Sequence, residues 1–204
     1  MRYYDGADPD DIWAVKSAGI DPSNGKELFY AKDGSYTYDF SYDDEVVCGN
    51  TRPDVEGVIG SSLNWKGFSV SLNFRYQMGA DVFNEALYNK VENISKNDLN
   101  KNQDRRALYE RWQKVGDIVH FKDIASAETT PMSSRFVQEE NVLTLESIYV
   151  GYEFYDGWIK KLGLSSLKIQ ASMRDVFRAS TIRSERGIAY PFARSMEAGL
   201  SFNF

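Results

Sequence analysis

The chain ends in R-S-M-E-A-G-L-S-F-N-F (Arg194–Phe204), along which apolar residues alternate without a break with polar residues or glycine. The apolar positions are Met196, Ala198, Leu200, Phe202 and Phe204. A repeat of two residues is that of a β-strand with one apolar and one polar face. A tilted strand needs about 9–11 residues to cross a hydrocarbon core, which matches this length. The stretch therefore predicts a terminal β-strand that is long enough to span a membrane.

The same stretch resembles the C-terminal β-signal of outer-membrane β-barrels, in which a polar residue and a glycine precede alternating apolar residues that end on an aromatic one. Glu197, Gly199, Phe202 and Phe204 occupy those places. The resemblance implies that these residues form a barrel-assembly signal read by the barrel-assembly machinery. The alternative is the last strand of a water-soluble β-sandwich, whose strands alternate in the same way.

Composition limits the class of protein. The chain has 204 residues, of which 14% are aromatic, and its mean hydropathy is −0.48. No apolar run approaches the roughly 18 residues of a membrane helix, which excludes a helical membrane protein. Apolar and polar residues alternate along the strands of a β-barrel, so the mean hydropathy of such strands is low. The low hydropathy therefore does not exclude a β-barrel. The net charge of −6 argues against a nucleic-acid or anionic-lipid surface.

Chemistry-bearing residues are few. Cys48 and His120 are the sole residues of their types, so neither a disulfide nor a histidine-based metal site can form within the chain, and His120 is expected in an exposed loop. The aspartates around Pro9 lack the spacing of a calcium loop and are expected to be solvated. No nucleophile–base pair or phosphate loop is present. We therefore predict no enzyme, no catalytic, metal or cofactor-binding residues and no cofactor.

Four further strands are predicted from alternation. Residues 56–77 predict a hairpin between two strands of about ten residues each. Phe68–Gln77 alternates strictly, the tight turn is Lys66-Gly67, and in the strand before it Ile59, Leu63 and Trp65 alternate with Ser62 and Asn64. Two more strands cover Ser147–Phe154 and Leu167–Arg174. Together with the terminal strand they predict an antiparallel meander.

The remaining segments are predicted to be mainly loops. Residues 1–55 are expected to contain short strands, one at Ile12–Ala18 and a hairpin between Glu27–Ala31 and Tyr36–Phe40. Residues 78–141 form a long polar excursion with one short helix at Asp104–Trp112. An excursion of this length in a compact domain is usually functional.

The connections between the predicted strands alternate between short turns and long loops. With the C-terminus placed in the periplasm, the short turns Lys66-Gly67 and 156–166 lie inside, and the long loops 78–141 and 178–193 lie outside. Outer-membrane barrels have short periplasmic turns and long extracellular loops. The pattern favours an all-β antiparallel meander that forms the C-terminal segment of a large transmembrane β-barrel with long extracellular loops.

The sequence resembles the C-terminal part of the SusC/RagA family of TonB-dependent outer-membrane transporters of Bacteroidetes. The stretches that carry the resemblance are G-I-D-P-S-N-G-K-E-L-F (19–29), V-V-C-G-N-T-R-P-D-V-E-G (46–57), D-R-R-A-L-Y-E-R-W-Q-K-V-G-D (104–117), S-R-F-V-Q-E-E-N-V-L-T-L-E-S-I-Y-V-G-Y (134–152), R-D-V-F-R (174–178) and S-E-R-G-I-A-Y-P-F-A-R-S (184–195). Residues 1–204 are then expected to be a C-terminal fragment of the barrel domain, without the plug and N-terminal domains. The export signal is expected upstream, since no basic-then-apolar leader follows Met1.

The resemblance to this family implies a function. Members form a barrel of about twenty-two strands with a plug in its lumen. They import oligosaccharides or peptides, are powered by TonB, and work with a SusD-like surface lipoprotein. The resemblance therefore implies a location in the outer membrane, surrounded by lipid, with loops at the cell surface and no nucleic-acid partner. The alternative reading is a soluble extracellular β-sandwich that binds carbohydrate through exposed Trp and Tyr.

Overall fold

In a computed structural model of the chain, residues 4–123, 125–126, 128–155, 157–182 and 194–204 are described. Two compact units are present, each built from two separate parts of the chain. The sheet unit comprises Asp54–Gly79 and Asn141–Phe204, and the loop unit comprises Met1–Pro53 and Ala80–Glu140. Most of the predicted loop 178–193 and of the 184–195 stretch lies outside the described residues.

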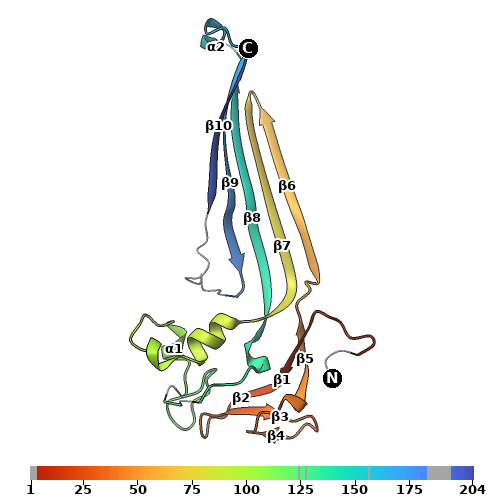
Figure 1. The fold of residues 1–204 in the computed structure, drawn as a ribbon, viewed down its shortest axis with the longest axis vertical. Helices are drawn as coiled ribbons and strands as arrows, with labels where there is room; N and C mark the ends of the chain where they lie inside the picture. The colour runs from red at the N-terminus through yellow and green to blue at the C-terminus, as the bar shows by residue number, and fades with distance from the viewer. Residues whose placement is uncertain (1–3, 124, 127, 156, 183–193) are drawn as a thin grey trace. The chain divides into compact units, whose positions relative to one another are not determined.

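The sheet unit is a five-stranded antiparallel meander with the strand order β10-β9-β8-β7-β6. Figure 1 shows these strands side by side, in sequence order from yellow to blue. Their bounds are β6 (Val55–Trp65), β7 (Phe68–Phe83), β8 (Val137–Phe154), β9 (Ser166–Ser180) and β10 (Ser195–Asn203). The five predicted strands and their antiparallel order are confirmed, although most of the strands are longer than predicted.

The β6–β7 hairpin turns on Lys66 and Gly67, as predicted. Both residues have positive φ values, 46° and 85°, as a two-residue turn that matches the strand twist requires. A Cβ atom on Gly67 would collide with the carbonyl oxygen of Glu153 on β8. Glu153 N donates a 2.8 Å hydrogen bond to Gly67 O, so the turn is held against the neighbouring strand.

The β8–β9 connection contains a short helix, α2 (Trp158–Lys161), that the sequence analysis did not predict. It follows Gly157, whose φ is 76°. Ile159 is fully buried, and the ring of Trp158 lies 5.9 Å from that of Phe154. The helix therefore packs onto the end of the sheet unit instead of forming an open turn.

The first part of the loop unit holds two small sheets. β1 (Asp11–Val15) pairs with β5 (Glu45–Asn50), and β2 (Ser17–Ile20), β3 (Glu27–Tyr30) and β4 (Tyr36–Thr37) form the other sheet, followed by the 3-10 helix η1 (Tyr42–Asp44). The strand predicted at Ile12–Ala18 is divided at Lys16, because its halves pair with different partners. The predicted hairpin is present as β3 and β4, with shorter strands.

The excursion is folded around a core of its own. It contains η2 (Leu87–Glu92), η3 (Lys96–Asp98), α1 (Arg106–Tyr109) and η4 (Ser134–Phe136). The buried cluster consists of Leu87, Val91, Ala107, Phe121 and Phe136. The helix predicted at Asp104–Trp112 is present as α1 but ends early, because Trp112 N donates to Phe121 O and the chain becomes extended. Within the described part of the chain, no helix is both long and apolar enough to cross a membrane.

Candidate functional site

One face of the sheet unit is apolar across three strands. Directly opposite residues in antiparallel strands share a face, so the register of β8, β9 and β10 defines transverse rows. The rows are Ile148–Met173–Met196, Val150–Ala171–Ala198, Tyr152–Ile169–Leu200 and Phe154–Leu167–Phe202. Several of these side chains are exposed, including Met196 (74%), Leu200 (64%) and Ile169 (46%). An apolar face of this extent marks an interaction surface.

The opposite face of the same strands is polar. Its rows are Ser147–Arg174–Ser195, Tyr149–Ser172–Glu197, Gly151–Gln170–Gly199 and Glu153–Lys168–Ser201. The side chains bond across strands: the Tyr149 hydroxyl donates to Gln170 Oε1 at 3.0 Å, and Asn73 Nδ2 donates to Ser147 Oγ at 2.9 Å. The predicted alternation therefore separates two surfaces of different chemistry.

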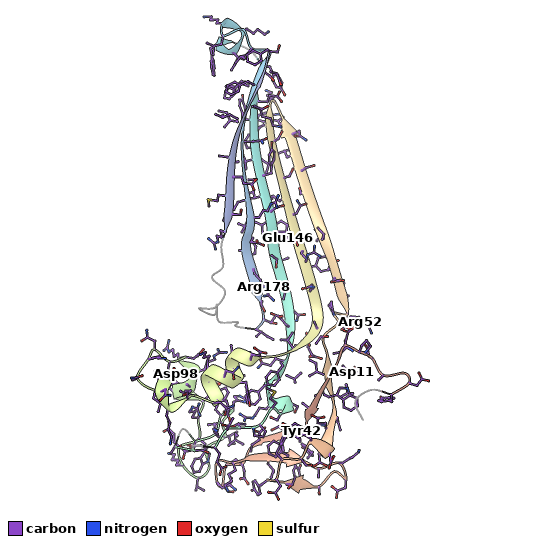
Figure 2. All side chains as sticks on the ribbon, in the orientation of Figure 1. Asp11, Tyr42, Arg52, Asp98, Glu146 and Arg178 are labelled. Carbon is purple, nitrogen blue, oxygen red and sulfur yellow. The ribbon has the colours of Figure 1, made fainter. Side chains whose placement is uncertain are left out.

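An ion pair and a bulge interrupt the regular rows. Arg75 on β7 donates from Nε to Glu146 Oε1 at 2.5 Å, and Glu146 is labelled on β8 in Figure 2. The β8–β9 register shifts between Leu145 and Ser147, and Asp175 on β9 has a φ of 51° there. Bulges of this kind redirect side chains locally. Both partners of the ion pair are partly exposed, so the pair contributes charge to this surface more than stability.

The residues of the predicted assembly signal lie on or next to β10. Glu197, Gly199 and Phe202 stand opposite Ser172, Gln170 and Leu167. Phe202 is 52% exposed, and Phe204, directly after the strand, is 92% exposed. A Cβ atom at Gly199 would lie 3.0 Å from Gln170 Nε2, so glycine leaves room for that amide. The geometry places the signal on an exposed strand, and its role in assembly stays a prediction.

The sheet has two outer strands, β6 and β10, among the strands that the structure describes. Each therefore has one edge without a neighbouring strand among the described strands. Unpaired strand edges bind other strands, and in a membrane their backbone groups must be paired. These edges are surfaces at which further strands can add.

The loop unit contains a buried ion-pair network centred on Arg135. Its Nη2 donates to Glu27 Oε2 on β3 at 2.8 Å and to Glu92 Oε1 on η2 at 2.7 Å. Ser133 Oγ donates to the other oxygen of Glu27 at 2.5 Å, and Thr130 Oγ1 donates to Glu92 Oε1 at 2.8 Å. Because Glu27 lies in Met1–Pro53 and Arg135 lies in Ala80–Glu140, the network joins the two chain segments of the loop unit.

The electrostatics of Arg135 follow from these contacts. Burial lowers the pKa of its guanidinium, but the hydrogen bonds and charges of Glu27 and Glu92 outweigh burial and raise the pKa above its ordinary value. The guanidinium also lies 4.6 Å from the ring centroid of Phe136. Removing one partner of such a buried pair leaves an uncompensated charge, which costs about 3–5 kcal/mol.

The structure also shows the surroundings of the other residues named in the sequence analysis, His120, Cys48 and the aspartates around Pro9. His120 is exposed, as predicted, and only its carbonyl oxygen takes part in the network, accepting from Arg135 Nη1. Cys48 is half-buried on β5, and burial raises the pKa of its thiol, which makes it a poor nucleophile. Asp8 caps Asp10 N and pairs with Arg52 at 2.7 Å. The described residues include no group of three or more potential metal-ligating side chains.

Comparisons with known proteins agree with this geometry. No family model matches the sequence. The chain is similar to TonB-dependent receptor P39 of Formosa agariphila, with 25% identity over 171 residues that cover 82% of this chain and 16% of the relative. It is also similar to TonB-dependent receptor P3 of the same organism, with 24% identity over 169 residues and 83% and 16% coverage. The chain thus spans about 16% of the length of these curated relatives.

The fold matches solved structures. A chain of the RagAB peptide importer in its open-open state aligns with a TM-score of 0.77 and 19% identity, over 99% of this chain and 23% of that one. The closed-closed state aligns with a TM-score of 0.75 and 19% identity, over 98% and 24%. Both units of the chain are therefore included in the alignment.

A five-stranded antiparallel meander with one apolar and one polar face has the architecture of a segment of a large transmembrane β-barrel. The sequence relatives and the structural neighbours narrow that class. The chain is similar in sequence to part of TonB-dependent receptors and in fold to part of the RagAB peptide importer, and the predicted resemblance to a TonB-dependent transporter of the SusC/RagA type is confirmed.

Proposed function

We propose that this chain is part of an outer-membrane, TonB-dependent nutrient importer that takes up oligosaccharides or peptides together with a SusD-like surface lipoprotein. The chain supplies neighbouring strands of the barrel wall and the loop unit. Its role is transport and not catalysis. The names of the sequence relatives and the peptide importer that shares the fold support this proposal.

The observation that carries the proposal is the exposed apolar face of β8, β9 and β10. Its side chains are the correct type for contact with lipid, whereas the polar rows match a water-filled lumen. Free edges on β6 and β10 suit pairing with neighbouring barrel strands. A segment of the barrel wall of an importer needs an apolar face toward lipid, a polar face toward the lumen and strand edges that pair with neighbouring strands.

The proposal extends to topology and partners. The loop unit lies at the cell surface, where substrate and the SusD-like lipoprotein meet the transporter. Coupling to TonB runs through parts of the transporter other than the strands and loops described for this chain. Glu197, Gly199, Phe202 and Phe204 direct insertion by the barrel-assembly machinery.

The alternative, a soluble β-sandwich that binds carbohydrate, requires a second sheet to cover the apolar face. The described strands of the sheet unit form one sheet, and several apolar residues of its rows, including Met196, Leu200 and Phe202, are exposed. This observation favours the barrel segment over the sandwich.

The test is deletion of the gene that encodes this sequence in its source bacterium. Growth and uptake are measured on a panel of oligosaccharides and peptides, with the corresponding monomers as controls. We expect uptake of one oligomer class to be lost and uptake of its monomer to be kept, with complementation by the intact gene. Unchanged uptake of every oligomer, or recovery of the protein in the soluble fraction, would refute the proposal.

A further inference from the structure

A cavity of about 580 Å³ lies within the loop unit, beside the η2–η3 segment. Its lining includes Glu92, Asn93, Lys96, Arg111, Lys122 and Glu128, and we name it the Lys122 cavity. Small-molecule sites usually have volumes of about 300–1,000 Å³. The cavity is therefore large enough for the end of an oligomeric substrate.

Arg111 contributes a buried cation to this cavity. Its residue exposure is 5%, and its Nη atoms donate only to backbone carbonyl oxygens, of Val91, Glu92 and Lys122. Its Nε is buried and has no hydrogen-bond partner among the described residues. Buried polar groups are normally paired, so this guanidinium is incompletely satisfied.

Lys122 contributes a second buried cation. Its residue exposure is 9%, and its ammonium donates to Asn93 Oδ1 at 3.4 Å and to the backbone carbonyl of Glu128. Both acceptors are uncharged, and an ammonium has three protons to donate. Burial lowers the pKa of Lys122 more than nearby Glu92 raises it, so the fold leaves this charge under-compensated.

The charge count of the buried groups is unequal. The three cations are Arg111, Lys122 and Arg135, and the two carboxylates are Glu27 and Glu92. Arg135 forms ion pairs with both carboxylates, at 2.8 and 2.7 Å. These five buried groups together carry one unbalanced positive charge. The two cations that form no ion pair with them, Arg111 and Lys122, line the cavity, whose lining also includes the exposed Glu128. Buried charges are stable only when paired.

We propose that the Lys122 cavity binds one carboxylate group of the transported oligomer, with Lys122 as its direct partner and Arg111 as the second cation. One monoanion neutralises the single unbalanced charge and accepts the free ammonium proton. The exposed Lys96 at the same cavity offsets the charge of the exposed Glu128, so these two exposed residues together do not repel an anion. The inference rests on the proposed import function and specifies the chemical class of its substrate.

A carboxylate can come from the C-terminus of a peptide or from a uronic acid in an oligosaccharide. Both offer the same planar, singly charged group to Lys122. The two sources are distinguished by pairs of probes in which only the carboxylate is neutralised. One pair is a pentapeptide of Ala and Gly as the free acid and as the C-terminal amide. The other is tetragalacturonate and its methyl ester.

The experiment measures binding of all four probes to the purified full-length transporter by calorimetry. The variants are Lys122→Gln, the charge-conserving Lys122→Arg, and Lys161→Gln as the control. Lys161 is an exposed lysine at the end of α2, in the sheet unit. Insertion of each variant is checked by heat-modifiable mobility on gels.

We expect one acid to bind at least about tenfold more tightly than its neutral partner, as for a buried hydrogen-bonded charge pair. Lys122→Gln should reduce that preference to below about threefold, whereas Lys122→Arg and Lys161→Gln should keep most of it. A preference for the peptide acid identifies a peptide terminus, and a preference for the galacturonate identifies an acidic oligosaccharide. If Lys122→Gln does not insert, the acid should instead protect Lys122, but not Lys161, from reductive methylation in the unmodified transporter.

Two results overturn the inference. One is the lack of an acid preference in both probe pairs, including a lack of any binding. The other is an unchanged preference in Lys122→Gln, or equal methylation of Lys122 with and without the acid. These results leave the import function standing if gene deletion still abolishes oligomer uptake. Loss of the import function itself would show as unchanged uptake after deletion.

Discussion

Arginine placed on the two faces of β9 tests the orientation of the sheet at adjacent positions. Ala171 lies in an apolar row between Val150 and Ala198, and Ser172 lies in a polar row between Tyr149 and Glu197. Both residues are small, so Ala171→Arg and Ser172→Arg add nearly the same side chain. We expect the first to be strongly destabilising and the second to be tolerated, because the new guanidinium of the second lies beside Glu197.

The magnitude follows from the depth of Ala171. It lies five residues along β9 from Ser166. At about 3.3 Å per residue this is about 16 Å along the strand. Taking Ser166 as the edge of the apolar band and a tilt of about 45°, the depth of Ala171 is about 12 Å, close to the middle of a band about 25 Å tall. Arginine at that depth costs about 2–4 kcal/mol. Such a cost lowers the folding equilibrium constant about 30- to 700-fold.

The assay is urea-dependent unfolding of the full-length transporter in lipid vesicles, followed by heat-modifiable mobility. We expect the midpoint for Ala171→Arg to fall well below that of the unmodified protein, and the midpoint for Ser172→Arg to stay close to it. Equal midpoints for the two variants, or a lower midpoint for Ser172→Arg, would show that the apolar face does not contact lipid.

The remaining predictions concern the buried network, the assembly signal, the topology and the isolated chain. Arg135→Met should destabilise the full-length transporter by about 3–5 kcal/mol, since Glu27 and Glu92 stay buried without the cation that forms ion pairs with both of them, whereas Arg52→Met, at an exposed pair, should barely change the thermal midpoint; similar midpoints for both would contradict this. Phe204→Ala and Gly199→Val should reduce the amount of transporter in the outer membrane, with Ser201→Ala as the control, and equal amounts in all three would remove the assembly signal. A protease site at the exposed Asn97 should be cut on intact cells, and cleavage only after the outer membrane is broken would reverse the topology. The isolated 204-residue chain should self-associate through the β6 and β10 edges and the apolar face, and sedimentation as a monodisperse monomer in plain buffer would contradict this.

The five long strands could be predicted because their pattern is local. Every second residue of β10 and of the first ten residues of β7 is apolar, and this period alone identifies a strand and its two faces. The hairpin at Lys66-Gly67 was predictable for the same reason, because two turn residues separate two alternating runs. The separation of polar and apolar rows in the structure follows directly from that pattern.

Strand ends were not predictable from local pattern. β8 begins at Val137, ten residues before the predicted start, and passes through the polar run Q-E-E-N. Within the extension, Val142–Leu145 pairs with Phe177–Ser180 of β9. Pairing with a partner strand, and not side-chain alternation, therefore determines the conformation there. The same reason explains why β5, which pairs with the distant β1, was missed.

The buried network was also beyond the reach of sequence reasoning. Arg135 is 108 residues from Glu27 and 43 from Glu92 along the chain, and no motif spacing connects them. Charged residues in hairpins and polar loops are normally solvated, so a search by composition assigns Arg135, Glu27 and Glu92 to the surface. The sole local hint is Phe136, an aromatic residue beside Arg135 that is fully buried and packs against Tyr88.

The buried network around Arg135 and two nearby contacts hold the two chain segments of the loop unit together. Ser17 N donates to Ser134 Oγ at 2.9 Å, Val15 forms a backbone bridge with Ser133, and Glu27 pairs with Arg135. All three contacts join the segment before β6 to the segment before β8. A single buried hydrogen-bonded arginine fixes the relative position of these segments more strictly than apolar packing, because its partners must lie within about 3 Å and in the plane of the guanidinium. The Lys122 cavity is lined by Glu92, a member of this network. Substrate bound there would therefore lie next to Glu92, whose position is tied through Arg135 to both chain segments of the loop unit.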